Sequence, residues 1–172
     1  WETANFRNTT FTWELPMENV AIEFDGYVVR NGFNVYLRNK KDIGYTLILG
    51  GWGNKKSGSQ YGEKWANRKL VNGKVWNAKQ WHHYKIVRKG DNLAAYCDGK
   101  LIFQRNIPKH FEGPAKLWFN SNNTPVGLDN VKVYKIQGGV PGGISQNTEP
   151  EPSKDNFGAP LWTYEDFNIN PI

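Results

Sequence analysis

The sequence is short of the residues that build disulfides, metal clusters and membrane spans. Cys97 is the one cysteine among 172 residues, which excludes an internal disulfide and a metal cluster held by several cysteines. We expect Cys97 to be a small core residue. No stretch approaches the roughly 20 apolar residues of a membrane-spanning helix, so no membrane span is expected. No segment shows a helical period of hydrophobic residues, which argues against a helical fold.

Long runs of one charge are also lacking. Lys and Arg together number 22 against 16 Asp and Glu, for a net charge of +6, but no five basic residues are consecutive. The excess would favour an anionic partner such as an acidic polysaccharide. Its scatter through turn segments equally fits ordinary solubility, and we expect no nucleic-acid partner.

The sequence is instead rich in aromatic residues and in alternating strands. Eight Trp, eight Tyr and nine Phe accompany 18 Gly and nine Pro, a composition that suits strands and turns. Asp98-Gly99 is a two-residue hairpin signal in which both residues need positive φ. The pattern predicts an all-β antiparallel β-sandwich. Its strands are expected at residues 11–15, 21–29, 33–38, 45–49, 81–88, 93–97, 101–106, 115–120 and 127–136.

The composition changes near the C-terminus. Residues 1–137 are expected to form the sandwich, and residues 138–158 form a linker rich in Gly and Pro that cannot bury a core. Residues 159–172 contain another strand-like aromatic segment. A lone strand is unstable in water, so this segment is expected either to dock beside residues 131–136 or to open a following module.

Two segments carry a family resemblance. The run at residues 81–102 resembles the core hairpins of the concanavalin A-like lectin and glucanase superfamily, and residues 126–134 resemble its closing strand. With residues 50–54, the resemblance spans about residues 5–137. It implies a jelly-roll sandwich of the laminin G-like, carbohydrate-binding-module type and an extracellular or cell-surface location. It also implies a structural Ca²⁺, for which Asp129 and Asp166 are the candidate ligands.

Exposed aromatic rings beside polar side chains are the predicted ligand site. A sugar ring packs its axial C–H groups on an aromatic face while its hydroxyl groups bond to neighbouring polar groups. The segment from Gly50 to Trp76 is too polar and glycine-rich to be core. Trp13, Trp81 and Trp118, by contrast, lie inside alternating strands and are expected to be buried. The predicted sugar-binding residues are Trp52, Tyr61, Trp65 and Trp76, with Arg38, Asn54 and Arg68 as polar contacts.

Catalysis has weaker support in the sequence. Retaining glycosidases of this superfamily carry Glu-x-Asp-x-Glu on one strand, and here Tyr27 stands in the third position after Glu23 and Asp25. Gln80-Trp81-His82, with Tyr84 on the face of His82, matches a short polysaccharide-lyase pattern, but the other lyase motifs are absent. No catalytic residue is assigned.

We therefore expect a non-catalytic carbohydrate-binding module of a larger secreted polysaccharide-active or surface protein. Two alternatives stay open. One is a polysaccharide lyase or glycoside hydrolase on the same fold, centred on His82, Tyr84 or Glu23. The other is a structural or adhesion module that contacts protein.

Overall fold

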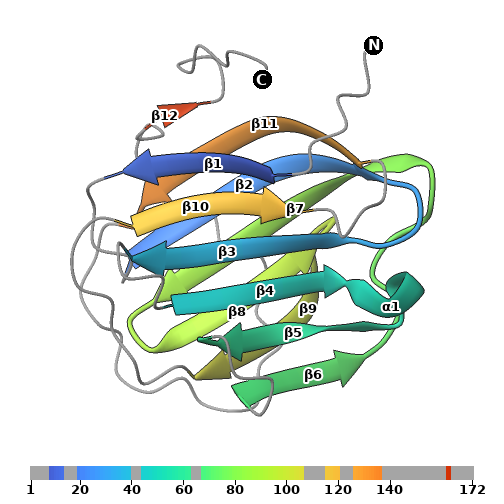
Figure 1. Ribbon diagram of the computed structural model, residues 1–172, viewed down its shortest axis with the longest axis horizontal. Helices are drawn as coiled ribbons and strands as arrows, with labels where there is room; N and C mark the ends of the chain where they lie inside the picture. The colour runs from blue at the N-terminus through green and yellow to red at the C-terminus, as the bar shows by residue number, and fades with distance from the viewer. Residues whose placement is uncertain are drawn as a thin grey trace.

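Two antiparallel sheets packed face to face make up the computed structural model, which describes residues 8–13, 19–39, 44–62, 67–106, 115–120, 126–136 and 162–163 (Figure 1). The first sheet has the order β1-β10-β3-β4-β5-β6, and the second has the order β12-β11-β2-β7-β8-β9. The all-β antiparallel sandwich expected from the sequence is therefore confirmed.

The elements follow the chain in this order: β1 (Asn8–Trp13), β2 (Asn19–Val28), β3 (Phe33–Asn39), β4 (Gly44–Gly50), α1 (Gly51–Asn54), β5 (Lys56–Tyr61), β6 (Arg68–Asn72), β7 (Gln80–Lys89), β8 (Asn92–Cys97), β9 (Lys100–Asn106), β10 (Ala115–Asn120), β11 (Val126–Lys135) and β12 (Trp162–Thr163). Nine of these strands lie where alternation predicted them. β5 and β6 lie in the segment that the sequence had marked as a loop, so that part of the prediction is wrong. No helix in the described part of the chain is long and apolar enough to cross a membrane.

Alternation places one side of most of the described strands in a shared core. Phe33, Val35 and Leu37 of β3 face the second sheet, where Phe24 of β2 and Tyr84 of β7 meet them. Phe24 and Tyr84 stack with their ring centroids 5.0 Å apart. Burial of these apolar surfaces supplies the main stabilisation of the sandwich, at about 25 cal/mol per Å² removed from water.

Local turn chemistry agrees with the sequence at the hairpin between β8 and β9. Asp98 and Gly99 have φ angles of 49° and 76°, the left-handed values that a type I′ turn needs. Near the C-terminus, β12 pairs antiparallel with Lys132–Val133 of β11, the position that the docking alternative predicts for this segment. All of residues 138–158, and residues 159–172 apart from β12, lie outside the described residues.

Candidate functional site

The outer face of the first sheet carries an aromatic pair topped by arginine. Tyr36 of β3 and Trp118 of β10 are register partners, and their rings stack at 4.8 Å with an interplanar angle of 14°. The Arg38 guanidinium lies over both rings, 4.9 Å from the Tyr36 centroid and 5.3 Å from that of Trp118. Arg38 also donates to the Thr46 hydroxyl at 3.2 Å. This packing orients the guanidinium against the sheet.

One donor of Arg38 is left over. Its Nε lies out of contact with water and has no hydrogen-bond partner among the described residues. Buried polar groups are nearly always paired, so a buried Nε without an acceptor is unusual.

A second aromatic ring lies at the far end of the same face. Trp52 of α1 is 47% exposed. The Arg68 guanidinium lies 5.3 Å from the Trp52 ring, and the Lys56 ammonium lies 6.0 Å from it. Arg68 of β6 donates to Oε1 of Gln60 at 2.8 and 3.1 Å, which fixes its direction. Burial lowers the pKa of Arg68 from its ordinary value, and nearby Tyr36 acts in the opposite direction.

The short element α1 positions Trp52 through an unusual backbone. Gly50, Trp52, Gly53 and Asn54 all have positive φ, between 52° and 74°, so the segment turns in the left-handed sense. Asn31 accepts a hydrogen bond from the Gly53 N–H at 2.8 Å and holds the turn from outside. The consequence is that the Trp52 side chain projects from the molecule instead of folding inward.

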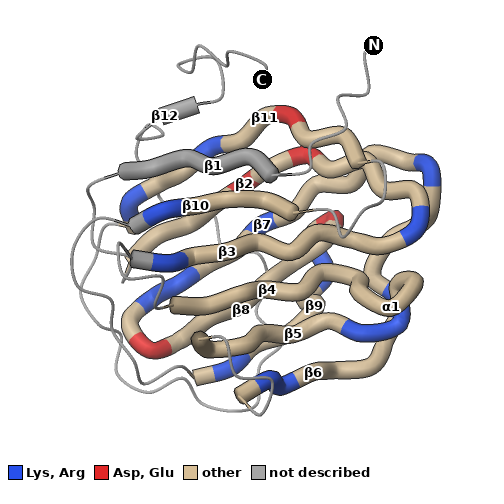
Figure 2. Tube along the Cα trace, in the orientation of Figure 1, with Lys and Arg blue, Asp and Glu red and all other residues tan. Residues whose placement is uncertain are grey.

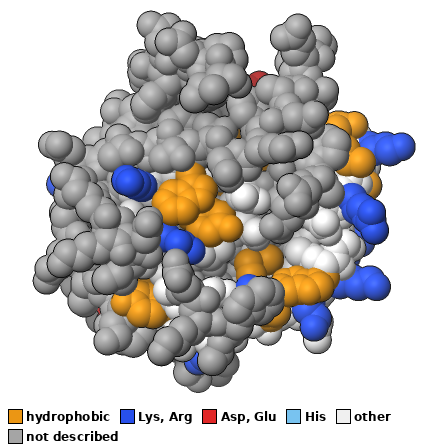
Figure 3. Space-filling model, viewed as in Figure 1, with side chains coloured by type: hydrophobic (Ala, Val, Ile, Leu, Met, Phe, Trp, Pro, Cys, Tyr) orange, Lys and Arg blue, Asp and Glu red, His pale blue; other side chains and the backbone are white. Residues whose placement is uncertain are grey.

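Figure 3 shows hydrophobic and basic side chains together on this face. In Figure 2, Lys and Arg mark β3, β5, β6 and β10, whereas the acidic residues on strands belong to the second sheet. None of the six strands of the first sheet contains Asp or Glu. Their basic residues are Arg38, Lys56, Arg68, Lys69 and Lys116. We call the outer surface formed by Tyr36, Arg38, Trp52, Arg68 and Trp118 the basic face.

The structure brings three of the predicted sugar-binding residues to the basic face: Arg38, Trp52 and Arg68. Tyr61 points toward the space between the sheets, where its ring lies 5.1 Å from that of Tyr45. Trp65 lies outside the described residues. The ligand contacts proposed for these side chains stay predictions.

Trp76 and Asn54 correct the expectation of an exposed loop. Trp76 is only 4% exposed and belongs to the core, because its indole packs against the bare backbone of Gly32 and Gly50. Asn54 is also buried. Its amide donates to the Trp76 carbonyl at 2.5 Å and accepts from the N–H groups of Val75 and Trp76 at 2.8 and 3.3 Å. Asn54 thus ties the chain down around Trp76.

Tyr36 was not predicted as a site residue, and two tryptophans are more exposed than predicted. Trp81 was expected to be buried but is 48% exposed, and Trp118 is half-buried on the outer side of its strand. The signal was present, because Trp118 stands between Leu117 and Phe119, which both face the core. Successive residues of a strand point to opposite faces, so Trp118 had to point outward.

Two of the three residues proposed for the lyase or hydrolase alternative are buried, whereas the third, Glu23, is partly exposed and lies 3.5 Å from the Lys85 ammonium. The Tyr84 hydroxyl is buried, and burial raises the pKa of Tyr84 strongly, so it is not available to a substrate as a base. His82 is also buried. Its Nδ1 lies 2.6 Å from Asp98, and its Nε2 lies 2.9 Å from the Asn77 carbonyl. Both ring nitrogens therefore have structural partners.

Two groups of side chains were considered as metal ligands. His82, Cys97 and Asp98 bring one ligand atom each within 4.8 Å of one another. The direct contact between His82 and Asp98 already satisfies that pair. For the predicted calcium site, the Asp129 carboxylate accepts from the Asn130 N–H at 2.8 Å, and Asp166 lies outside the described residues. The calcium site stays a prediction.

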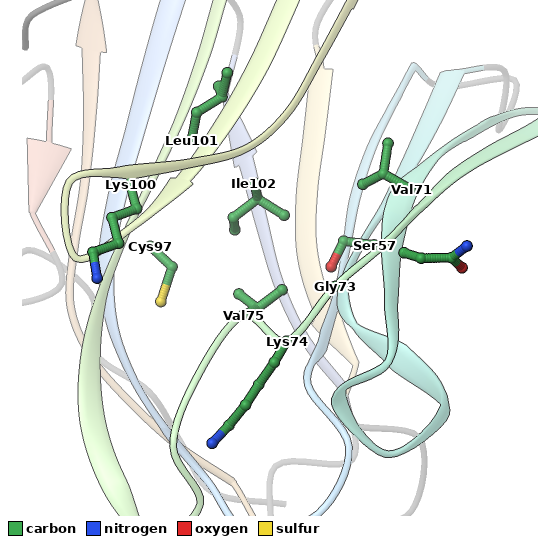
Figure 4. Close-up of a pocket in the computed structure, with 10 residues that line it drawn as sticks. Ser57, Val71, Gly73, Lys74, Val75, Cys97, Lys100, Leu101 and Ile102 are labelled. Atoms are coloured by element: carbon green, nitrogen blue, oxygen red, sulfur yellow. The ribbon is translucent and has the colours of Figure 1, made fainter.

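A cavity of about 250 Å³ opens between the edges of the two sheets. Figure 4 shows Cys97, Leu101 and Ile102 on one side of it, with Val71 and Val75 on the other. Lys74 and Lys100 also line it. Burial raises the pKa of the Cys97 thiol to about 12, which keeps that group protonated and unreactive. The cavity lacks the aromatic and guanidinium groups of the basic face.

Known structures share this fold. The carbohydrate-binding module CBM66 of Bacillus subtilis aligns with a TM-score of 0.55 and 15% identity over 73% of this chain and 81% of its own. Galectin-Ib of Xenopus laevis aligns with a TM-score of 0.58 and 12% identity over 74% and 99%. Toad ovary galectin, solved with thio-digalactose, gives a TM-score of 0.56 and 10% identity over 74% and 98%. At these identities the likeness establishes the fold alone.

The search of curated protein sequences found no match. A family model does match, over residues 2–134, which include both sheets except β12 and the end of β11. The chain therefore belongs to the family of 3-keto-alpha-glucoside-1,2-lyase-like domains, within the concanavalin A-like lectin and glucanase superfamily.

Proposed function

We propose that the protein binds a carbohydrate on the basic face. The observation that carries the proposal is the Arg38 guanidinium, which Tyr36, Trp118 and Thr46 orient on the same face as the exposed indole of Trp52. A sugar hydroxyl or carboxylate oxygen is an acceptor for the N–H groups of a guanidinium. Trp52 offers its exposed indole to the C–H groups of a sugar ring.

The charge of the face favours an anionic sugar. Arg38, Lys56, Arg68 and Lys116 point outward from strands that contain no Asp or Glu. A planar guanidinium pairs with a carboxylate or sulfate through two parallel hydrogen bonds. We propose uronate-containing or sulfated oligosaccharides as the ligand class.

Calorimetric titration with a neutral, a uronate and a sulfated oligosaccharide at two salt concentrations tests the proposal. We expect the anionic ligands to bind more tightly, and their affinity to fall as salt screens the charges. Trp52→Ala and Arg38→Ala should each weaken binding about tenfold, the effect expected of a central contact.

Two variants sharpen the test. Arg38→Lys keeps the charge but loses the planar fork, so it should retain the salt dependence while losing affinity. Leu101→Ala removes an exposed apolar side chain from β9 of the opposite sheet and serves as the control. Equal affinity of the wild type and Arg38→Ala for every ligand would refute a site at the basic face.

A second candidate function is elimination from a 3-keto-glucoside, which the family membership favours. In this reaction a base takes the proton from C2, which the neighbouring ketone acidifies. The electrons form the C1–C2 double bond, the C1–O bond breaks, and the leaving oxygen takes up a proton. The described part of the basic face holds no His, Asp or Glu to act as the base.

A base of the right kind lies on the opposite sheet. The His83 Nδ1 lies 2.8 Å from an Asp25 oxygen, and His83 is about half exposed. A carboxylate that holds Nδ1–H leaves Nε2 as the proton acceptor. A 3-keto-glucoside incubated with the protein should then yield an unsaturated ketone, seen by its ultraviolet absorbance. The rate should fall about a hundredfold or more in His83→Gln, and a rate equal to that of buffer alone would reject this function.

A further inference from the structure

Trp81 is an exposed aromatic residue on the second sheet, and its indole lies along the sheet. Trp81 belongs to β7, and its register partner in β2 is Tyr27. The register partner of Tyr27 in β11 is Gly127. A Cβ built on Gly127 would lie 2.8 Å from Cη2 of Trp81. Since β7 and β11 flank β2 on opposite sides, the indole must extend across the sheet surface to reach Gly127.

Glycine at position 127 is what allows this posture. Any larger residue would meet the six-membered ring of Trp81, with two ring carbons within 3.2 Å of the added Cβ. Beneath the indole, the Tyr27 ring supports it at 5.7 Å and 55°. The indole therefore rests on backbone and on Tyr27, and it remains 48% exposed on its outer side.

Polar groups with fixed directions lie in the next row of the same face. The two Asp25 oxygens accept from different neighbours: Oδ1 lies 2.8 Å from Nδ1 of His83, and Oδ2 accepts from the Asn130 amide at 2.6 Å. Asn130 reaches Asp25 from the bulge in β11, with φ at 50°. The Nε2 of His83 has no partner among the described residues.

We propose that this surface is a second carbohydrate-binding site, in which one sugar ring stacks on Trp81 and its hydroxyl groups bond to His83 and Asn130. A flat, open indole beside oriented polar groups is the arrangement that packs the C–H face of a hexopyranose. Sugars with all hydroxyl groups equatorial, as in β-linked glucose chains, present the flattest such face.

The charge of this site sets the ligand class apart from that of the basic face. The Lys85 ammonium lies 3.5 Å from the Glu23 carboxylate and offsets its charge, and Asp25 is hydrogen-bonded to His83 and Asn130. No guanidinium contacts Trp81 in the described part of the chain, so nothing at this site favours an anionic sugar. The ligand is a neutral β-linked gluco-oligosaccharide.

The two sites lie on the outer faces of opposite sheets and do not compete. A protein with both could hold two glycan chains, or two segments of one chain, at once. Linked sites raise the overall affinity for a polymer well above that of either site alone. The second site does not depend on the first or on any elimination reaction.

The test is a titration of ¹⁵N-labelled protein with cellopentaose and laminaripentaose, followed by the indole N–H resonances. Trp81→Ala identifies the Trp81 signal. We expect one of the two sugars to shift that signal in the wild type and in Trp118→Ala, with little effect of salt. Trp81→Ala should weaken binding at least about tenfold, and Trp81→Phe should retain part of the affinity.

Further variants separate the elements of the site. Asn130→Ala removes one hydrogen-bond partner of the sugar hydroxyl groups. Gly127→Ala displaces the Trp81 indole from its position across the sheet. Both variants should bind the sugar more weakly. Leu101→Ala, an equally exposed apolar residue on the same sheet, should leave it unchanged. Unreacted glucans cannot undergo the elimination, so loss of that activity leaves this test standing.

Two results would overturn the proposal. One is a Trp81 resonance that neither sugar moves, or an affinity that survives Trp81→Ala. The other is a Trp81 resonance that shifts with protein concentration in the absence of sugar, which would assign the surface to a second copy of the chain. If the basic face fails its own titration while the Trp81 signal responds, only the first proposal falls.

Discussion

Asn54 offers the sharpest test of whether the loop after β4 is a ligand surface or a structural anchor. Its side chain is 8% exposed and makes three hydrogen bonds to the backbone of Val75 and Trp76. Its φ of 66° lies in the left-handed region, which Asn tolerates better than most residues. Replacing Asn54 therefore perturbs two separable things, the hydrogen bonds and the backbone conformation.

The expected loss of stability follows from these contacts. Asn54→Gly keeps the left-handed backbone accessible but leaves two N–H groups and one carbonyl without partners, at a cost of about 2–4 kcal/mol. Asn54→Ala adds about 1 kcal/mol of backbone strain, for a total of about 3–5 kcal/mol. Asn54→Asp keeps an acceptor oxygen for the two N–H groups but sets its second oxygen against the Trp76 carbonyl, so its loss should be at least as large as that of Asn54→Gly.

Urea unfolding followed by tryptophan fluorescence and circular dichroism measures the free energy of unfolding of the three variants. The order of stability should be wild type, Gly and then Ala, with Asp no more stable than Gly. Near-wild-type stability of Asn54→Ala, together with lost glycan binding, would refute the structural role and return Asn54 to the ligand contacts. Loss of the hydrogen bonds to Val75 and Trp76 in the Asn54 variants should also make the segment after β6 more sensitive to proteases.

Three further outcomes follow from the core and its edges. In native protein, Cys97 should resist iodoacetamide at pH 8, because burial raises its pKa to about 12; mass spectrometry should find labelling only after unfolding, and rapid native labelling would contradict this. Burial tends to raise the pKa of Asp98, but hydrogen bonds from His82 and from the His83 N–H outweigh it and lower that pKa. The carboxylate therefore stabilises the fold above an ordinary Asp pKa of about 4 and loses this effect as pH falls below it. In Asp98→Asn, the free energy of unfolding should fall less as the pH is lowered through this range, and an unchanged pH dependence would count against these hydrogen bonds. Gly26→Ala should destabilise by about 1–3 kcal/mol, because the added Cβ meets the rings of Phe33 and Tyr84; an unchanged melting temperature would show that the core yields freely.

Alternation predicted nine strands because their inward residues are large and apolar. It failed at β5 because the inward residues there are polar. Ser57 and Ser59 are buried and bonded, the first to the Gly50 N–H at 2.9 Å and the second to Arg105 at 2.8 Å. A strand whose buried side is serine shows no hydrophobic period, so β5 resembled a loop.

The burial of Trp76 could not be predicted from the residues next to it in sequence. The polar residues Lys74 and Asn77 lie close to it in sequence, and no long apolar run includes it. The slot that receives the indole comes from Gly32 and Gly50, which are far from it in sequence and which the pairing of β3 with β4 brings together. Exposure of Trp81 depends in the same way on Gly127 and the register of three strands. Side-chain exposure follows from strand register, and the sequence alone did not supply the register.

The grouping of charged residues on each face also depends on strand pairing. Along the sequence, the basic residues are scattered and fit ordinary solubility. In the fold, Arg38, Lys56, Arg68 and Lys116 share one outer face, because their strands are neighbours or next neighbours in the first sheet. The strand carboxylates Glu23, Asp25 and Asp129 fall on the second sheet. A modest net charge thus becomes a marked difference between two faces, and salt should affect glycan binding at one face and leave the other almost unchanged.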